Sequence, residues 1–301
     1  MRVLVTGGTG GVGRRLVARL LDRGDEALVL SRDAARARAW LDPRVTILEG
    51  DPSREGAWQE VVPTCDGVVH LAAHSIWGRR WSAAEKERIR TSRVEATGRV
   101  AEAVAAAPRV ALVSASAVGQ YYGAHGDEPL DDDAAPADTF IASICADWER
   151  ACAPAVDAGA RVSYARIGVV LSSALDKMTG PFRWFLGGAP GSGEQWVPWV
   201  DPRDLAEMLL FALACPEMRG PFNAVGPEPV RMRELARALG SALDRPAWVP
   251  VPELAVRLAL GEVACMVLSG ARARPVKLER LGFRHAHGDL DGALRDALAA
   301  P

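Results

Sequence analysis

The 301-residue sequence predicts a doubly wound α/β fold, a parallel sheet with helices on both faces, followed by a smaller C-terminal α/β lobe. Three observations lead to this prediction. Short β-branched runs alternate with longer amphipathic segments up to Leu171, which is typical of parallel strands joined by crossover helices. A glycine-rich turn follows the first of these runs. After Leu171 the sequence becomes rich in Gly, Pro and Trp, and its helical patterns pair less regularly with strands.

The β-branched runs and the amphipathic segments give the expected elements in order. The strands are RVLVT (2–6), ALVLS (27–31), VTILE (45–49), GVVHL (67–71), VALVSA (110–115) and VSYARIGVVL (162–171). The helices are expected over 11–23, 53–62, 81–107 and 139–158. Because βαβ units are right-handed, few topologies remain. We expect a first domain over 1–171, completed by parts of 200–230, and a substrate-side lobe over 172–301.

The overall composition argues against several classes of partner. The net charge is -2, so the chain has no broad basic field for a nucleic acid backbone or an anionic membrane. The longest apolar run, 254–270, contains Arg257 and Glu262, which favours an amphipathic helix over a membrane span. A small-molecule substrate is therefore the expected partner.

Cysteine usage and the first residues bear on location. The five cysteines are scattered, without a CxxC pair or a metal-ligand spacing, which indicates reduced thiols and no metal site. The start MRVLVTGG enters a strand and a glycine turn at once, so no targeting leader is expected. We expect a cytoplasmic protein. The acidic stretch GDEPLDDDAAPAD (126–138) is expected to be an exposed loop.

The strongest local signal is VLVTGGTGGVGRRLVARLL, in which glycines form GxxGxxG between an expected strand and an expected helix. Glycine permits the tight turn, lets the backbone approach a pyrophosphate and allows the helix to pack closely on the strand. The helix N-terminus then offers amide donors to the anion. A purely structural turn is the alternative, and the context favours dinucleotide binding. The expected contacts are Gly7, Thr9, Gly10, Gly11, Val12 and Gly13.

The end of the second strand indicates which dinucleotide binds. An acidic residue there would take the ribose hydroxyls of NAD, whereas Ser31 and Arg32 offer a hydroxyl and a guanidinium to a 2′-phosphate. Asp33, one residue on, is better explained as a helix cap. NADP(H) is therefore the expected cofactor.

Further motifs are spread over nearly the whole chain. They are HLAA (70–73), RRW (79–81), SRVEAT (92–97), SASAVGQYYG (114–123), GDE (126–128), DWE (147–149), GGAPGSGEQW (187–196) and VPVPELAVRLALGE (249–262). Together with TGGTGGVG (6–13), they resemble the extended short-chain dehydrogenase/reductase superfamily and, more narrowly, its atypical group of epimerase family proteins.

This resemblance implies an NAD(P)-binding Rossmann domain with a C-terminal extension. It implies that Ser116 matches the superfamily's catalytic serine or threonine, which hydrogen-bonds the reacting oxygen. It also implies a set of cofactor contacts, from the adenine to the nicotinamide. They are Asp51 near the adenine, Leu71, Ala72, Ala73 and Ser114 along the cofactor, and Ile167 and Val169 near the nicotinamide.

The superfamily's YxxxK proton-transfer pair is missing from this sequence. The pair would lie on the helix expected over 139–158, yet none of the chain's three tyrosines has a lysine four residues later. The positions that would face the cofactor hold Phe140 and Ile144 or, with a shift of one residue, Ile141 and Cys145. Either pair is apolar.

Arg93 is a second departure, because it replaces the superfamily's usual asparagine. A guanidinium at this position can hold a cofactor phosphate or a substrate carboxylate in bidentate geometry. The alternative is a surface arginine on a long helix. We include Arg93 among the expected cofactor contacts.

The missing lysine restricts the chemistry. Without it, a tyrosine with a pKa of about 10 is ionised to only about one part in a thousand at pH 7, so it is a poor base but still an acid. Candidate acids are Tyr121 and Tyr122, which follow Ser116 after the fifth strand, although adjacent tyrosines often only pack. His125 is a second candidate, with a solvated loop residue as the alternative.

The leading interpretation is an NADPH-dependent reductase of a small carbonyl or enone substrate. A redox-silent NADP(H)-binding sensor or interaction protein is the alternative, and a nucleotide-sugar epimerase comes third. Gln195, Trp196 and Trp199 are expected to line the substrate pocket, although both tryptophans could instead seal the lobe interface. The chain is expected to be a monomer or a homodimer.

Overall fold

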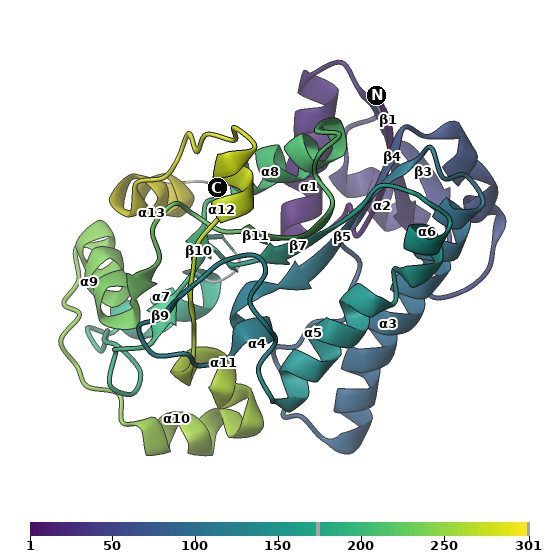
Figure 1. The fold of residues 1–301 in the computed structure, drawn as a ribbon. Coiled ribbons are helices and arrows are strands. Elements are labelled where there is room, and N and C mark those ends of the chain that lie inside the picture. Colours follow the sequence, from purple (N-terminus) through teal and green to yellow (C-terminus); the bar gives the residue numbers. More distant parts are fainter. Residues whose placement is uncertain (173–174, 300–301) are drawn as a thin grey trace.

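A seven-stranded parallel sheet forms the centre of the protein (Figure 1). The computed structural model describes residues 1–172 and 175–299, apart from the side chains of residues 120, 176 and 177. The strand order is β11-β7-β5-β4-β1-β2-β3, and every neighbouring pair is parallel. The order reverses between β1 and β4, and in folds of this kind ligands bind outside the carboxyl ends of the strands at such a point. The predicted doubly wound fold is confirmed.

Six of the seven strands of the sheet lie where the β-branched runs predict them. The strand at 220–224 was not predicted, and the expected strand 162–171 is divided between this sheet (162–167) and a separate two-stranded sheet (169–170). The seven strands of the sheet are β1 (Arg2–Thr6), β2 (Glu26–Ser31), β3 (Thr46–Glu49), β4 (Gly67–His70), β5 (Ala111–Ala117), β7 (Val162–Ile167) and β11 (Gly220–Ala224). Most of their apolar side chains are buried, because helices cover both faces of the sheet. The seventh strand, β11, is reached only after the chain has left the sheet and returned through α8 (Pro202–Ala214).

The helices divide between the two faces of the sheet. α1 (Gly11–Asp22) and α8 pack together on one face, over a core that includes Val5, Val29 and Phe222. α3 (Ala83–Ala105), α5 (Phe140–Arg150) and α6 (Ala153–Asp157) lie on the other face, as Figure 1 shows. α2 (Ala34–Trp40) joins β2 to β3.

Three segments differ in detail from the expected elements. The expected helix 53–62 is the 3-10 helix η1 (Ala57–Thr64). The expected helix 139–158 is divided into α5 and α6, because Pro154 favours a new helix start over continuation of the old one. The tyrosines at 121 and 122 lie in a short helix, α4 (Val118–Tyr122), and not in a loop.

The C-terminal lobe is built from short strands and helices around its own core. Its strands are β8 (Val169–Val170), β9 (Trp196–Val197), β10 (Trp199–Val200), β12 (Val230–Arg231) and β13 (Arg272–Ala273). Its helices are α7 (Leu175–Arg183), α9 (Met232–Leu243), α10 (Glu253–Leu260), η2 (Gly261–Ala264), α11 (Cys265–Leu268), α12 (Val276–Arg280) and α13 (Leu290–Ala299). Trp199 and Leu235 are buried at its centre. The run 254–270 thus forms short helices interrupted at Gly261, and none of the described helices is long and apolar enough to cross a membrane.

The acidic stretch 126–138 is not simply an exposed loop, and this part of the prediction is wrong. It contains β6 (Pro129–Leu130), which pairs with β13 from the C-terminal lobe. Asp132 is buried, and its carboxylate accepts hydrogen bonds from the backbone N–H groups of Asn223 and Lys277. Burial raises the pKa of Asp132, while these two donors oppose that rise. The stretch therefore ties the end of β11 to α12.

We expect Asp132→Ala to lower the free energy of unfolding by about 3 kcal/mol, because two buried N–H groups lose their acceptor. Chemical denaturation would measure this loss. Asp133→Ala, at the exposed neighbouring position, is the matched control and should change stability by less than about 0.5 kcal/mol. Equal losses in the two variants would contradict the structural role given to Asp132.

Candidate active site

The glycine turn between β1 and α1 has no room for side chains at two of its positions. Gly7 has a φ of 73°, and a Cβ built on it would lie 2.8 Å from the backbone nitrogen of Ala72. A Cβ on Gly13 would lie 2.2 Å from the carbonyl oxygen of Gly7. By contrast, a Cβ on Gly11 would meet nothing within 4 Å. Gly7 and Gly13 are therefore packed against the protein backbone, whereas the space around Gly11 is free for a ligand.

The N-terminus of α1 is available to an anion. Its N-cap residue is Gly10, so no side chain caps the first turn. The first backbone N–H groups of a helix have no partner within the helix, and together with the helix dipole they attract a phosphate. Gly10 and Gly11 are exposed, and Thr9 and Val12 are half-buried. The turn therefore fits the pyrophosphate of a dinucleotide.

Two of the residues expected at the adenosine end lie at the carboxyl end of β2, Ser31 as its last residue and Arg32 directly after it. Ser31 donates its hydroxyl proton to the carbonyl oxygen of Asp33 at 3.0 Å, and Arg32 is exposed. Asp33 accepts a hydrogen bond from the backbone N–H of Arg36 at 2.8 Å, so its side chain caps α2, as weighed from the sequence. No acidic side chain is therefore left at the position where NAD-specific proteins bind the ribose.

Asp51 lies close to the same corner. Burial acts to raise the pKa of this carboxyl, but hydrogen bonds from Ser53 and the charges of Arg32 and Arg54 outweigh burial and hold the pKa below its ordinary value. Asp51 is therefore ionised at neutral pH and lies within electrostatic range of Arg32. The two residues expected at the 2′-phosphate and the adenine thus belong to one site.

The segment after β4 lies against the glycine turn. The buried ring of His70 bonds the hydroxyl of Thr6 at 2.7 Å, and that hydroxyl accepts the backbone N–H of Ala72 at 3.3 Å. Burial lowers the pKa of His70 to about 4, so the ring is neutral. This chain of contacts places Leu71 and Ala72 directly beside Gly7.

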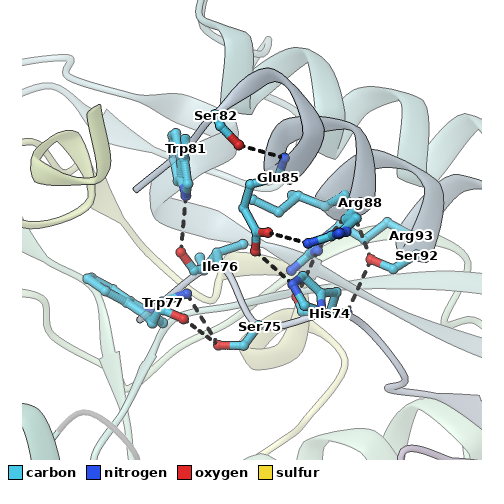
Figure 2. A network of polar contacts seen from close by, with 11 residues as sticks. His74, Ser75, Ile76, Trp77, Trp81, Ser82, Glu85, Arg88, Ser92 and Arg93 are labelled. Atoms are coloured by element: carbon cyan, nitrogen blue, oxygen red, sulfur yellow. Dashed lines mark hydrogen bonds and ion pairs between the residues drawn. The ribbon is translucent and has the colours of Figure 1, made fainter. Parts of the chain in front are cut away.

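Arg93 is a buried guanidinium and not a surface arginine. Its Nη1 donates to the carbonyl oxygens of His74 and Ile89, both at 3.1 Å, and its Cζ lies 5.0 Å from the centre of the Trp148 ring. Burial lowers the pKa of Arg93, and no ion pair with a carboxylate is found for it among the described residues. Figure 2 shows the side chain below α3, next to His74. An uncompensated buried cation of this kind favours an anionic ligand.

Ser116 lies at the end of β5, where it takes part in a buried ion pair. Its hydroxyl donates to Glu149 at 2.7 Å, and the same carboxylate accepts two hydrogen bonds from Arg166, at 2.8 and 2.9 Å. Ser116 and Arg166 are partners in the register of β5 and β7, so both side chains leave the sheet on the side of α5. A serine has one proton to donate, and here Glu149 receives it. Ser114 is also buried, with a weak bond to the carbonyl oxygen of Ala115.

The two tyrosines of α4 have different surroundings. Tyr122 is fully buried, and its hydroxyl contacts the carbonyl oxygen of Asp131 at 2.7 Å, Asn223 at 2.9 Å and Arg166 at 2.9 Å. Burial raises its pKa to about 12. Tyr121 lies with its ring 3.5 Å from the guanidinium carbon of Arg166, and burial also raises its pKa. Both tyrosines are therefore protonated at neutral pH.

Helix α5 presents apolar side chains at the positions of the missing pair. Ile141, Ile144 and Cys145 are buried, whereas Phe140 is 41% exposed. Burial raises the pKa of Cys145 to about 12, although Arg93 opposes this rise. Cys145 also acts on the pKa of Tyr121. The thiol of Cys145 therefore lies within electrostatic range of both Arg93 and Tyr121.

The residues expected at the substrate all bond to the C-terminal lobe or to its edge. Gln195 donates to the carbonyl oxygens of Pro190 and Val267, at 3.0 and 2.9 Å. Trp196 donates to Asp127 at 3.1 Å, and Trp199, 1% exposed, donates to the carbonyl oxygen of Glu228 at 2.9 Å. These contacts match the alternative in which the tryptophans seal the lobe. Ile167 and Val169, at the carboxyl end of β7 and the start of β8, are half-buried.

One pair of polar side chains at this edge was missed from the sequence. The ring of His74 bonds Glu85 on α3 at 2.8 Å, as Figure 2 shows. His74 follows directly after the strand-end motif HLAA, and this was the available signal. Its partner, Glu85, is one of many charged residues in the helix α3, and nothing in the sequence marks which of them contacts His74.

Comparisons with known proteins identify the family. The NAD dependent epimerase/dehydratase family matches residues 3–145, and a domain of unknown function, DUF1731, matches residues 251–297. The chain is 38% identical to an Arabidopsis thaliana protein named "Epimerase family protein SDR39U1 homolog, chloroplastic", over 98% of this chain and 86% of the relative. It is 34% identical to the Bacillus subtilis epimerase family protein YfhF, over 99% and 98% of the two chains.

Solved structures are similar over the whole chain. Human epimerase family protein SDR39U1 (isoform 2), crystallised with NADPH, superposes with a TM-score of 0.86 at 32% identity and covers 100% of both chains. A Thermus thermophilus UDP-glucose 4-epimerase with NAD gives a TM-score of 0.78 at 23% identity, over 99% and 98% of the chains, which shows the shared fold alone. The cytoplasmic location stays a prediction, since the Arabidopsis relative is named as chloroplastic. The chain belongs to the NAD dependent epimerase/dehydratase family, in the group of epimerase family proteins that carry a C-terminal DUF1731 domain.

Proposed function

We propose that the protein is an NADPH-dependent reductase of a small carbonyl or enone substrate. The observation that carries this proposal is the contrast between the cofactor side of the site, at the glycine turn, and the proton-transfer side, on α5. The glycine turn and the uncapped α1 N-terminus form a complete cradle for a dinucleotide. The apolar positions of α5, in contrast, offer no group that can take a proton from an alcohol. A site of this kind can accept a hydride donor and still lack the base for oxidation.

The residues present fit NADPH along its whole length. The N–H groups at the start of α1 hold the pyrophosphate, and Ser31 and Arg32 hold the 2′-phosphate, with Asp51 beside them near the adenine. Leu71 to Ala73 line the path of the cofactor, Arg93 supplies positive charge, and Ile167 and Val169 lie at the nicotinamide end. NADPH, when bound, supplies the hydride. Its presence in the human relative's crystal structure supports this choice of cofactor.

Proton balance favours reduction as the direction of the reaction. Reduction of a carbonyl leaves an alkoxide that needs a proton, whereas oxidation of an alcohol needs a base. A tyrosine with a pKa of about 12 is ionised to only about one part in a hundred thousand at pH 7, and burial holds Tyr122 at that value. The tyrosines of α4 are therefore available as donors but not as bases.

Of the three predicted catalytic residues, Tyr121 is the best placed to face a substrate. The hydroxyl of Ser116 donates its hydrogen bond to Glu149, and the hydroxyl of Tyr122 makes all three of its contacts with groups of the protein. Tyr121 is slightly exposed, and its ring lies on the guanidinium of Arg166. Its hydroxyl keeps its proton and is available to donate a hydrogen bond to the substrate oxygen. Ser116 and Tyr122 then have a structural role, because their hydrogen bonds fix Glu149 and Arg166 next to Tyr121.

A redox-silent NADP(H)-binding protein is a second candidate. The observation that favours it is the use of Ser116, Tyr122 and Glu149 in internal contacts, which leaves few free polar groups at the expected reaction centre. Such a protein would use cofactor occupancy to control an interaction. Both functions require tight NADPH binding, so only turnover separates them.

Turnover is tested by the loss of NADPH absorbance with a panel of aldehydes, ketones, quinones and enones. We expect reduction of at least one apolar member, with NADPH preferred over NADH. Failure of every compound, despite NADPH binding measured by fluorescence, would favour the redox-silent candidate.

Arg32→Ala tests the cofactor preference. Because a charge-assisted hydrogen bond is worth roughly 1.5 to 3 kcal/mol, we expect the Kd for NADPH to rise about tenfold to a hundredfold and that for NADH to stay nearly constant. Arg38→Ala, on the exposed side of α2, is the matched control. An equal loss for both cofactors would contradict the contact between Arg32 and the 2′-phosphate.

Tyr121→Phe and Tyr122→Phe separate a donor from a structural hydroxyl. We expect Tyr121→Phe to lower kcat by about a hundredfold without changing the Kd of NADPH, since it removes a donor to the substrate oxygen. Tyr122→Phe is expected mainly to lower the free energy of unfolding, by about 2 kcal/mol, because it leaves buried polar partners unsatisfied. A larger kcat loss in the Tyr122 variant would reverse this assignment.

A further inference from the structure

His74 and Glu85 form a polar pair at the carboxyl edge of β4, and no function described so far uses them. The ring Nε2 of His74 lies 2.8 Å from Oε1 of Glu85. The carboxylate is only 6% exposed, whereas the imidazole is 42% exposed. Figure 2 shows Glu85 reaching from α3 to the ring, with Arg88 on the other side of the carboxylate. A buried carboxylate thus holds a half-open imidazole.

Glu85 keeps its negative charge in this arrangement. The hydrogen bond to His74 is the largest reason why the pKa of Glu85 lies below its ordinary value, and Arg88 and Arg79 add to the effect. Arg88 approaches the second carboxylate oxygen at 3.4 Å. Because an ionised carboxylate only accepts hydrogen bonds, the imidazole must donate through Nε2. Glu85 therefore fixes the tautomer and the orientation of the ring.

The second ring nitrogen, Nδ1, remains for chemistry. Within residues 1–172 and 175–299, no hydrogen bond to Nδ1 is found. When the ring is protonated, both nitrogens carry a hydrogen, and the proton on Nδ1 can be given away while Nε2 stays bonded to Glu85. Orientation of an imidazole by a carboxylate on its other nitrogen is the arrangement that makes histidine an effective acid and base in hydrolases.

The backbone of His74 is held in place by contacts on both sides. Its N–H donates to Ser92 at 3.1 Å, and its carbonyl oxygen accepts from Arg93 at 3.1 Å. Two residues earlier, Ala72 lies against Gly7 of the glycine turn. Arg93 in turn lies within electrostatic range of Cys145. His74 is thus fixed between the dinucleotide cradle and the place on α5 where the proton-transfer pair is missing.

The other histidines do not offer this chemistry. The sequence contains five, and among the described residues only His74 forms a pair with a carboxylate. His70 is buried and held neutral, and His285 bonds the carbonyl oxygen of Val225. His125 is exposed, and among the described residues no side chain orients it. His287 contacts Asp204 through its backbone N–H, and no carboxylate pairs with its ring in the part of the chain that the structure describes.

We propose that His74, oriented by Glu85, is the proton donor that replaces the missing tyrosine and lysine. This inference rests on the proposed reductase function. A hydride from NADPH forms the new C–H bond at the substrate carbon, and the electron pair of the C=O π bond moves to oxygen. That oxygen takes the proton from Nδ1 of the His74 imidazolium, which leaves NADP⁺, an alcohol and a neutral ring. Solvent then reprotonates the half-open ring, while Tyr121 keeps its own proton.

The first test needs no substrate. Diethyl pyrocarbonate modifies accessible neutral imidazoles, and mass spectrometry of the digested protein reports the rate for each histidine. We expect His74 to be modified in the free protein and to be protected by saturating NADP⁺, because it follows two residues after Ala72, which lies against the glycine turn. His125 is the internal control and should react equally with and without NADP⁺. A His74 rate that NADP⁺ leaves unchanged would overturn the inference, whatever the enzyme reduces.

The second test uses turnover and chemical rescue. We expect His74→Ala to lower kcat by about a hundredfold, with the Kd of NADPH nearly unchanged and a small fall in melting temperature because Glu85 loses a donor, and we expect free imidazole to restore part of the loss in kcat. Glu85→Gln should lower kcat with little change in KM, since it acts through the ring and is a positioning residue. Lys86→Met is the matched control, because it breaks an ion pair of the same helix with Glu262 and leaves His74 untouched.

The outcomes separate the two proposals. Reduction by the wild type together with a kcat loss in His74→Ala no larger than that in Lys86→Met, or a loss that imidazole does not restore, would overturn the role of His74 and leave the reductase standing. A wild type that reduces none of the compounds would overturn both, because a proton donor without turnover has no reaction to serve. Protection by NADP⁺ together with rescue by imidazole would support both.

Discussion

The polar residues at the ends of β5 and β7 depend on the buried ion pair between Glu149 and Arg166. Arg166 is 2% exposed, and its guanidinium bonds the carboxylate through two nitrogens, at 2.8 and 2.9 Å. Burial opposes the charge on Arg166, but Glu149 outweighs it and keeps the pKa of the guanidinium raised. Taking two charges out of water costs several kcal/mol each, so such a pair is tolerated only where further hydrogen bonds satisfy both groups. Here Ser116, Tyr122 and the carbonyl oxygen of Asp132 supply them.

This pair explains why Ser116 matches the superfamily in residue type but differs from it in hydrogen bonding. Ser116 occupies the strand end where the superfamily has an oxygen-binding serine, but its proton is directed to Glu149. Positive charge is also placed differently. Without a lysine on α5, the buried cations near Cys145 are Arg93 from α3 and Arg166 from β7. Removing either Glu149 or Arg166 would leave the other as an uncompensated buried charge. A single substitution therefore cannot free Ser116 from this pair without a loss of stability.

The sequence predicted those parts of the structure that rest on local patterns. Six of the seven strands of the sheet were found from β-branched runs, and the cradle from glycines whose spacing is fixed by contacts within one turn. The seventh strand, β11, was not predicted. The sequence did not predict features that join distant residues. Asp132 looked solvated because its partners, Asn223 and Lys277, lie 91 and 145 residues away. The pairs Glu149 with Arg166 and His74 with Glu85 were missed for the same reason, since no periodicity marks which charged residue of a helix turns inward.

The distribution of polar groups bears on which chemistry the site can support. A sugar epimerase must take a proton from an alcohol and later give it back, so it needs a side chain that can act as a base. The hydroxyls of the tyrosines around Arg166 cannot serve as bases, because burial raises the pKa of both and keeps them protonated. Groups with unused donors or lone pairs lie instead on the β4 side, where Arg93 and His74 are held by backbone carbonyls and by Glu85. Reaction at that side needs only one proton per turnover, and solvent can replace it through a ring that is 42% exposed. The geometry is therefore consistent with a reduction in which His74 gives one proton per turnover and regains it from solvent.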